Sequence, residues 1–473
     1  MKLFSNLKKF GSKIALIEKD KKISFNELET YKRGIHLFKP NSLVLLINDN
    51  SFESLKFYIV LMKLDKISLM LIDNNTNINS VNETINVYKH EYIILPKSKF
   101  KFIKKDAEII SVDGHYLLLK SNKFNNLIKI NHNNKLMLTT SGTLGSSKFV
   151  KLSNENLKFN SNQIIKYLNI KKNDQVITTM PVSYSYMLSI INTHLDSGCT
   201  IHLNNKSIFQ REFWEYFKKK KINSFSGVPY HFQILEKNNF KFLETSSLKY
   251  ITCAGGKLEK RIINKIYKFC IAKKLKFFLM YGQTEASPRI SYLPFKYLKQ
   301  KTESIGRGID GTKLWVEDHK KKQIKTCNKI GELVCKGNNI FNGYSDSRKD
   351  LSKKITNNKI LRTGDLAYFD KDKFFYICGR KSRLAKIFGI RINLDELEKK
   401  LSNKSEKVLC KAGINKIYLY TTKSYKKNLM TKAEKITLQN KSAFEVKILY
   451  KFPRTNSGKI KYSLLKTNED QAQ

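Results

Sequence analysis

The chain has 473 residues, of which 41% are hydrophobic and 11% are aromatic. At roughly 100–200 residues per domain this length accommodates two to four domains or subdomains, which excludes a disulfide-stapled mini-protein and an intrinsically disordered chain. The formal net charge is +49, a value that invites a polyanionic partner such as nucleic acid or an anionic membrane.

Lysine carries most of this charge, because only 11 of the 89 basic residues are arginines. Lys, Asn and Ile are all abundant, as an AT-rich coding sequence would supply, and the basic residues are spread along the whole chain. Base and phosphate recognition relies more on arginine forks than on lysine point charges. We therefore attribute the charge to composition, with a polyanionic partner as the alternative.

Seven cysteines are scattered without a C-x-x-C pair or a histidine at ligand spacing. Their odd number predicts free thiols in a reducing compartment and no zinc site. Residues 1–22 contain lysines throughout and no continuous apolar stretch, so we expect no signal peptide. The most apolar stretch, 57–72, is too short and too charged to span a bilayer. The expectation is a cytoplasmic protein without a transmembrane segment.

Apolar runs of strand length alternate with amphipathic segments from residue 42 to residue 280. Such alternation predicts parallel sheets covered by helices. The first series has expected strands over 42–47, 67–72, 92–95 and 135–138, with a helix over 51–66. The second series has expected strands over 175–180, 199–203, 222–227, 250–254 and 276–280, with helices over 186–195, 209–221 and 258–273.

The pattern shortens into β-rich pieces from about 312 to 378, with strands expected over 313–316, 331–336 and 374–378. It changes to a short α+β segment from residue 382. The sequence therefore predicts an α/β fold with a large N-terminal domain of parallel sheets layered with helices over 1–381. This domain carries the small β-rich subdomain, and a small α+β C-terminal domain follows over 382–473.

A hydroxyl- and glycine-rich loop follows the strand expected over 135–138, and it reads Thr139-Thr140-Ser141-Gly142-Thr143-Leu144-Gly145-Ser146-Ser147-Lys148. Glycines let backbone N–H groups approach an anion closely, the hydroxyls add donors and the lysine adds a charge. The spacing differs from the Walker loop, which needs a second glycine followed by Lys-Ser or Lys-Thr. The loop indicates phosphate binding, with a polar surface turn as the alternative.

A second motif closes the strand expected over 276–280, where ligands bind in open α/β sheets. It reads Tyr281-Gly282-Gln283-Thr284-Glu285. Tyr281 suits stacking on a base, and Glu285 suits Mg²⁺, which takes one or two carboxylates plus phosphate oxygens. A strand-end turn with a solvated glutamate is the alternative.

Three further pieces are weak when each is taken alone. Asp365 follows a tight turn, and its carboxylate suits both hydroxyls of a ribose. Arg380 follows Cys378-Gly379, and Lys386 opens a short apolar run. The terminal piece runs from Pro453 to Lys459.

The order and spacing of these pieces resemble the ATP-dependent adenylate-forming superfamily, which includes acyl-CoA synthetases, adenylation domains and luciferases. The resemblance begins at the segment Ile-Ser-Phe-Asn-Glu-Leu over 23–28 and ends at Lys459, so it covers nearly the whole chain.

The resemblance implies a nucleotide site built from several motifs. Its phosphate-binding loop corresponds to Thr139, Thr140, Ser141, Gly142, Thr143, Gly145 and Lys148. Its adenine contacts correspond to the turn of Gly255 and Gly256 and to the aromatic Tyr281 with the adjoining Gly282. Its phosphate and Mg²⁺ contacts correspond to Thr284 and Glu285, and its ribose contacts to Asp365 and Arg380. Lys459 corresponds to the lysine that neutralises developing charge, so Lys459, Glu285 and Thr284 are the catalytic candidates.

The sequence departs from the family pattern at four positions. Leu144 and Ser147 replace a small hydroxyl residue and a proline in the loop. Ser382 stands at the hinge where aspartate is common, and Tyr462 replaces a frequent arginine. None of these changes removes a group assigned to chemistry, so the expectation is an active enzyme.

The resemblance implies two half-reactions that use ATP, Mg²⁺ and a phosphopantetheine thiol. A carboxylate is first adenylated, and the thiol of CoA or of a carrier protein then takes the acyl group. Residues 382–473 would act as a mobile lid that exchanges the Lys459 loop for the Lys386–Gly389 region. The oligomeric expectation is a monomer or homodimer.

The segment over 181–187 contains no acid to pair with a substrate amine, and an unpartnered buried amine is strongly disfavoured. This favours an uncharged fatty or aryl acyl tail. Tyr184, Met187 and Tyr230 are candidate lining residues, with a plain core role as the alternative. Two rival functions remain open, namely an amino-acid or D-alanine ligase that loads a carrier protein and a non-catalytic basic binding protein.

Overall fold

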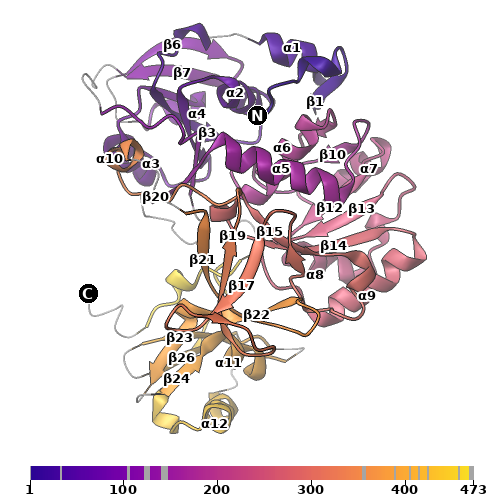
Figure 1. Cartoon of the computed structure of the whole chain (residues 1–473), viewed down its shortest axis with the longest axis vertical. Helices are drawn as coiled ribbons and strands as arrows, with labels where there is room; N and C mark the ends of the chain where they lie inside the picture. Colours follow the sequence, from indigo (N-terminus) through magenta and orange to yellow (C-terminus); the bar gives the residue numbers. More distant parts are fainter. Residues whose placement is uncertain are drawn as a thin grey trace. The chain divides into compact units, whose positions relative to one another are not determined.

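The computed structural model describes residues 2–31, 35–103, 107–121, 128–139, 148–353, 358–387, 390–403, 406–413, 416–422, 426–455 and 459–467. The chain forms two compact units (Figure 1). Unit 1 comprises Met1–Thr302, Gly308–Lys313 and Lys336–Leu361, and unit 2 comprises Glu303–Arg307, Leu314–Cys335 and Arg362–Gln473. The expected lid boundary between residues 381 and 382 stays a prediction.

The first sheet of unit 1 has the strand order β20-β9-β8-β4-β3-β5-β7-β6. Its strands are β3 (Ser42–Asn48), β4 (Ile67–Asp73), β5 (Tyr92–Pro96), β6 (Ala107–Asp113), β7 (Tyr116–Ser121), β8 (Leu136–Thr139), β9 (Phe149–Leu152) and β20 (Tyr344–Ser345). The central strands β8, β4, β3 and β5 are parallel, as the sequence predicts, whereas the outer pairs are antiparallel.

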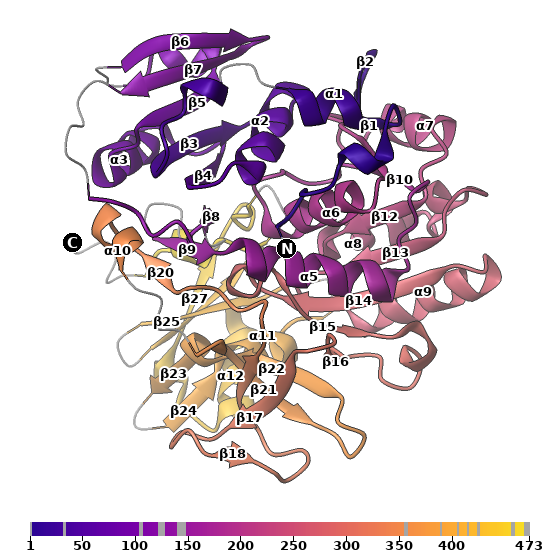
Figure 2. The same ribbon diagram turned by 45° about the horizontal axis from the view of Figure 1, so that its top comes forward.

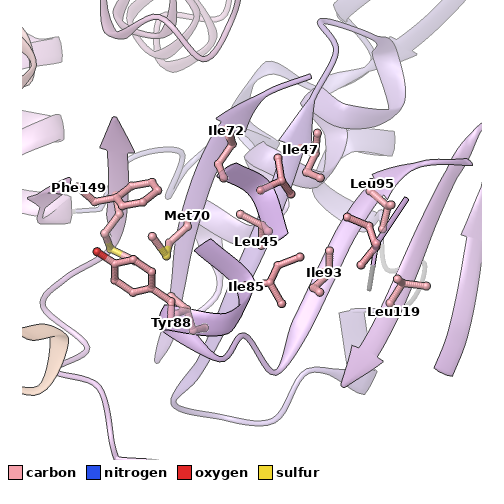
Figure 3. Packing of buried hydrophobic residues seen from close by; sticks show 14 of the residues in the cluster. Leu45, Ile47, Met70, Ile72, Ile85, Tyr88, Ile93, Leu95, Leu119 and Phe149 are labelled. Atoms are coloured by element: carbon pink, nitrogen blue, oxygen red, sulfur yellow. The ribbon is translucent and has the colours of Figure 1, made fainter. Parts of the chain in front are cut away.

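The central strands of this sheet are buried because helices cover them. Every residue of β3 is buried, which explains its continuous apolar sequence. The covering helices include α2 (Phe52–Lys63) and α3 (Ile78–Tyr88). Ser51 begins α2 by accepting a hydrogen bond from the Ser54 N–H. Figure 3 shows the resulting core, in which Leu45, Met70, Ile85 and Ile93 pack together.

A segment from much later in the chain completes the edge of this sheet. β20 pairs antiparallel with β9, with Tyr344 opposite Val150 and Ser345 opposite Phe149. The Tyr88 hydroxyl donates to the Ser345 carbonyl over 2.8 Å. The buried Arg348 follows, and it pairs with Glu91 and donates to the Tyr88 carbonyl. These contacts fix residues 344–348 beside the N-terminal strands.

The second sheet of unit 1 runs β15-β14-β13-β12-β10-β11-β1-β2. Its strands are β1 (Ile14–Glu18), β2 (Lys21–Ser24), β10 (Gln175–Ile177), β11 (Thr200–His202), β12 (Ser224–Gly227), β13 (Tyr250–Cys253), β14 (Lys276–Gly282) and β15 (Arg289–Leu293). Strands β1 and β10 to β14 are parallel, and β2 and β15 add antiparallel edges.

Helices flank this second sheet (Figure 2). They are α5 (Asn154–Leu168), α6 (Ser185–Asp196), α7 (Arg211–Lys219), α8 (Pro229–Lys237) and α9 (Lys260–Ala272), and the shorter helices of unit 1 are α1 (Phe25–Thr30), α4 (Lys97–Phe100) and α10 (Arg348–Ser352). Helix α5 packs on α6, which packs on β11, and α8 and α9 pack together against β12 and β14.

The described residues of unit 2 form short strands and the α-helices α11 and α12. One sheet has the order β18-β17-β19-β21-β22, from β17 (Lys313–Glu317), β18 (Gln323–Ile324), β19 (Gly331–Lys336), β21 (Ile360–Phe369) and β22 (Phe375–Arg380). The remaining elements are β23 (Leu384–Ile387), β24 (Ile390–Asn393), α11 (Leu394–Leu401), β25 (Leu409–Ala412), β26 (Ile417–Thr421), α12 (Lys426–Thr437) and β27 (Phe444–Ile448). An apolar core joins α11 and α12 to the β25-β26-β27 sheet.

Across the described residues, no helix combines the length and the apolar character needed to cross a bilayer.

Candidate functional site

The glycine-rich loop connects two neighbouring strands of the first sheet. Thr139 ends β8 and pairs in register with Phe149 on β9. Eight predicted loop positions lie outside the described residues, namely Thr140, Ser141, Gly142, Thr143, Leu144, Gly145, Ser146 and Ser147. The structure therefore describes the two ends of this loop, the exposed Thr139 and the half-buried Lys148.

Tyr344 links Lys148 to Glu285. The Lys148 ammonium lies 4.2 Å from the centre of the Tyr344 ring, within the range of a cation–π contact. The hydroxyl of the same tyrosine donates to Glu285 Oε1 over 2.8 Å. Burial raises the pKa of Tyr344, and the neighbouring Glu285 carboxylate adds to the rise. The Tyr344 side chain thus contacts both Lys148, which the sequence predicts to bind phosphate, and Glu285, which the sequence predicts to bind Mg²⁺.

Tyr281 and Gly282 end β14, and Thr284 and Glu285 lie in the turn that follows it, all four half-buried. Gly282 is required there because a Cβ at this position would overlap the Pro288 carbonyl. Thr284 and Glu285 lie in a short 3₁₀ helix that starts directly after this strand.

Contacts from two other segments, the start of α6 and residues 339–341, hold this turn. The Thr284 and Ser185 hydroxyls lie 3.2 Å apart, and the Phe341 N–H donates to the Glu285 carbonyl over 2.9 Å. The Asn339 amide donates to the carbonyls of Ala286 and Arg289. These hydrogen bonds therefore hold in place the backbone that carries the Glu285 carboxylate, the candidate catalytic group.

The predicted glycine turn follows β13. Gly255 has φ = +88°, and a Cβ there would collide with the Tyr184 hydroxyl. Gly256 is exposed beside the Pro229 ring. Of the three candidate lining residues, Tyr184 thus lies against the glycine turn, Met187 is completely buried, and the half-buried Tyr230 contacts Phe209 edge-on.

Unit 2 carries the candidate ribose contacts on paired strands. Asp365 on β21 lies opposite Arg380 on β22, and Arg380 Nε lies 3.1 Å from Asp365 Oδ1. Asp365 is buried and the arginine side chain is largely exposed. Gly364 has φ = +72° but lies within β21, so the tight turn expected before the aspartate is wrong and a left-handed glycine inside a strand takes its place.

The two predicted lysines of unit 2 are described to different extents. Lys386 belongs to strand β23, and its side chain lies outside the described part of the chain. Lys459 is half-buried, and its backbone closes a small loop on Thr455. The Thr455 N–H donates to the Lys459 carbonyl over 2.7 Å, and the Lys459 N–H donates to Thr455 Oγ1 over 3.1 Å.

Two of the departures from the family pattern lie on either side of one buried ion-pair network. Ser382 is exposed in a 3₁₀ helix that runs from Lys381 to Arg383. Arg383 bonds Asp395 over 2.8 Å and pairs with Glu398. Its guanidinium lies over the Tyr462 ring at 4.1 Å, and the Tyr462 hydroxyl donates to Glu398 over 2.8 Å. Tyr462 thus packs against Arg383, the residue that follows the predicted hinge position Ser382.

Sequence reasoning missed Tyr344 and Arg383. Tyr344 lies on a two-residue strand whose partner is about 200 residues away, so no local pattern reveals it. The sequence analysis did not single out Arg383, although Asp395 and Glu398, at i+12 and i+15 on the following helix, are a usable signal.

A family model described as "AMP-binding enzyme" matches residues 68–345. A probable 4-coumarate–CoA ligase 3 from Dictyostelium discoideum is 30% identical over 282 residues, which cover 59% of this chain and 50% of that protein. A 2-succinylbenzoate–CoA ligase from Bacillus cytotoxicus is 27% identical over 279 residues, covering 59% and 56%. The chain spans about half the length of the curated relatives that it matches.

Two solved structures share the fold over nearly the full chain. The O-succinylbenzoate coenzyme A synthetase of Bacillus subtilis, in complex with ATP and magnesium ion, has a TM-score of 0.74 at 20% identity and covers 98% of this chain and 99% of its own. ATP-bound MatB from Rhodopseudomonas palustris has a TM-score of 0.77 at 16% identity, with the same coverage. These likenesses confirm the predicted fold class.

Proposed function

The chain belongs to the AMP-binding enzyme family, and from this premise we propose that it is an ATP-dependent acid–thiol ligase. In the first half-reaction, a carboxylate oxygen attacks the α-phosphorus of ATP, and the bond to the departing pyrophosphate breaks. In the second, a thiol sulfur attacks the acyl carbon, AMP leaves and the thiol proton is released. The acceptor proposed is the phosphopantetheine thiol of CoA, with a carrier protein as the other source of the same thiol.

The observation that carries this proposal is the connection of Lys148 to Glu285 through Tyr344. The attacking carboxylate approaches a polyanion, so the reaction needs positive charge held at fixed points. Lys148 supplies one such charge beside the glycine-rich loop, at 4.2 Å from the tyrosine ring. Tyr344 holds the Glu285 carboxylate on the same side of the turn.

The residues present fit Mg²⁺ held mainly by its nucleotide. The described part of the chain contains no cluster of three His, Cys, Asp or Glu side chains that would form an all-protein cage. A single carboxylate at Glu285, with phosphate oxygens completing the shell, is a usual arrangement for this ion. When bound, Mg²⁺ would offset the charge of the triphosphate.

Asp365 and Arg380 are proposed to hold the ribose. Arg380 Nε lies 3.1 Å from the buried carboxylate, so the arginine fixes the direction of the carboxylate proposed to contact the ribose. Lys459 is proposed to neutralise charge during adenylation only, and the region around Lys386 to serve the thiol step.

The acid proposed is one without an amino group, of the fatty or aryl class. A second candidate, an amino-acid ligase, is favoured by one contact that the sequence did not reveal. Ser183 Oγ donates to Asp73 Oδ2 over 2.7 Å, which brings a carboxylate to the segment that has none of its own. None of the seven cysteines forms a disulfide, and this supports a reducing, cytoplasmic location as part of the proposal.

ATP–pyrophosphate exchange across a panel of fatty, aryl and amino acids tests this function. We expect exchange with at least one acid lacking an amine, and Glu285→Gln is expected to lower it about 100-fold because an aimed charge is lost. Glu259→Gln is the matched control, since that glutamate is exposed at the start of α9. Absence of exchange with every acid would reject the proposal, and exchange restricted to amino acids would establish the second candidate.

A further inference from the structure

Two opposite charges of the candidate site contact the same aromatic ring and do not contact each other. The Lys148 ammonium lies over the face of the Tyr344 ring, at 4.2 Å from its centre. The Tyr344 hydroxyl donates to Glu285 Oε1 over 2.8 Å. Among the described residues, neither Lys148 nor Glu285 belongs to an ion pair. The width of one phenol therefore separates the ammonium from the carboxylate.

The sheet sets the position of this ring. Tyr344 begins β20, where it lies opposite Val150 on the neighbouring strand β9 (Figure 2). The Phe341 ring contacts the Tyr344 ring edge-on, with 4.9 Å between the ring centres. Lys148 directly precedes β9. The paired backbones thus place the ring beside the ammonium, whatever the two charges do.

Both contacts of Tyr344 are of a kind that a ligand can replace. The tyrosine is 40% exposed, and a cation over an exposed ring is held more weakly than a cation beside a carboxylate. Burial and the Glu285 carboxylate raise the pKa of Tyr344, so the phenol keeps its proton and acts as a neutral donor. A phosphate oxygen can therefore replace the ring at Lys148, and Mg²⁺ can replace the hydroxyl at Glu285.

A direct contact between Lys148 and Glu285 would oppose the binding of a nucleotide. Opposite charges on neighbouring side chains attract each other, and water screens this attraction incompletely at half-buried positions. A lysine paired with Glu285 would have to leave the carboxylate before it could bind a phosphate. The glutamate would likewise have to leave the ammonium before it could bind Mg²⁺.

We propose that Tyr344 is a positioning residue that prevents Lys148 and Glu285 from pairing with each other and so keeps both charges available to Mg²⁺-bound ATP. The proposal rests on the proposed ligase function and explains why an aromatic ring lies between the two groups. Tyr344 acts through these neighbours and takes no part in making or breaking bonds. A ring at this position is therefore essential, and the hydroxyl is secondary.

Calorimetric titration of the full chain with ATP measures whether the two charges are available, without requiring turnover. With Mg²⁺ present, Tyr344→Ala is expected to bind ATP at least about tenfold more weakly than the wild type, because the new ion pair must break first. Tyr344→Phe keeps the ring between the charges, and we expect it to lose no more than about threefold, for one missing hydrogen bond.

A second substitution distinguishes this role from a general loss of structure. In EDTA, ATP binds without Mg²⁺, so Glu285 affects Lys148 only as a competitor of the phosphates. Glu285→Gln is then expected to strengthen ATP binding about fivefold more in Tyr344→Ala than in the wild type, because the carboxylate holds the lysine only when the ring is missing. Removing a second side-chain charge would not restore a misplaced strand.

Urea unfolding supplies a readout that needs neither nucleotide nor turnover. Lys148→Met and Glu285→Gln are combined in a double-mutant cycle, once in the wild type and once in Tyr344→Ala. In the wild type we expect the two substitutions to act independently on the unfolding equilibrium constant. In Tyr344→Ala we expect a coupling of about two- to fivefold, as for other partly exposed ion pairs.

The outcomes separate the two proposals. Wild-type ATP affinity in Tyr344→Ala, equal losses in Tyr344→Ala and Tyr344→Phe, or an effect of Glu285→Gln that is the same with and without the ring would overturn the role of Tyr344 and leave the ligase function in place. A wild type that binds no ATP, combined with coupling that occurs only in Tyr344→Ala, would reject the ligase function and retain the role of Tyr344.

Discussion

Each residue with a proposed catalytic role lies on a backbone segment that hydrogen bonds hold in place. Lys459 illustrates this, because both of its backbone hydrogen bonds to Thr455 are independent of its side chain. A substitution at Lys459 therefore tests the ammonium group without opening the loop that carries it.

We predict that Lys459→Ala lowers adenylation about 10²–10³-fold, since one cation aimed at developing charge is lost. Thioester formation from a supplied acyl-adenylate should be retained. The two half-reactions are measured separately, by pyrophosphate exchange and by thiol consumption. Lys461→Ala, two residues away, is the control, and equal losses in both half-reactions for Lys459→Ala would contradict a lid with two positions.

At the scale of elements, the short 3₁₀ helix from Lys381 to Arg383 joins the β22 strand to the C-terminal elements. Its end is anchored, because Arg383 bonds Asp395 and Glu398 at the start and middle of α11. The backbone N–H of Arg380 also donates to Asp395 over 2.9 Å. These contacts tie the backbone before Ser382 and the side chain after it to the same aspartate.

We predict that Ser382→Pro keeps adenylation and lowers thioester formation about tenfold or more. Proline fixes φ near −65°, a value that a 3₁₀ helix accepts, and it removes the freedom that a hinge needs. Separate assays of the two half-reactions check this, with Ser382→Ala expected to match the wild type. Wild-type rates in both steps for Ser382→Pro would mean that the hinge lies elsewhere.

Elements whose residues are all apolar could be predicted from the sequence, and others could not. Strands β3 and β4 were predicted within one residue because their burial is continuous. Helix α5 was missed because it buries polar residues, among them Asn160, whose amide donates to the Arg289 carbonyl. The hydrogen-bond acceptor of the Asn160 amide is a backbone carbonyl far along the chain. Only the folded structure therefore shows why an asparagine can be buried in this helix.

The same limit applies to the candidate site. Glycines and carboxylates such as Gly255 and Asp365 could be placed by motif order, since each motif is local. Tyr344 could not, because its role depends on a contact with Glu285, a residue of a distant segment.

At the scale of the whole molecule, the net charge of +49 is a property of a lysine-rich surface. Several acidic residues form ion pairs with basic side chains. Asp174 pairs with Lys249, and Glu236 pairs with Arg261 and Lys265. Basic residues in excess of these pairs are spread over both units.

We predict weak binding to duplex DNA that disappears by moderate salt and shows no sequence preference. Diffuse lysines release counter-ions without reading base edges. Titration of labelled duplexes of different sequence at several salt concentrations measures this. Sub-micromolar, sequence-dependent binding at about physiological salt would overturn the attribution of the charge to composition.

The pairing of β9 with β20 has a consequence for the protein as it is being synthesised. Strand β9 lies near residue 150, and its edge partner emerges from the ribosome about 200 residues later. At roughly 5–20 residues per second this interval lasts on the order of 10–40 s. During that time the edge of the first sheet stands open to other nascent chains. Arrival of Tyr344 closes that edge and completes the contact with Glu285, so maturation of the sheet and assembly of the site are a single late event of biosynthesis.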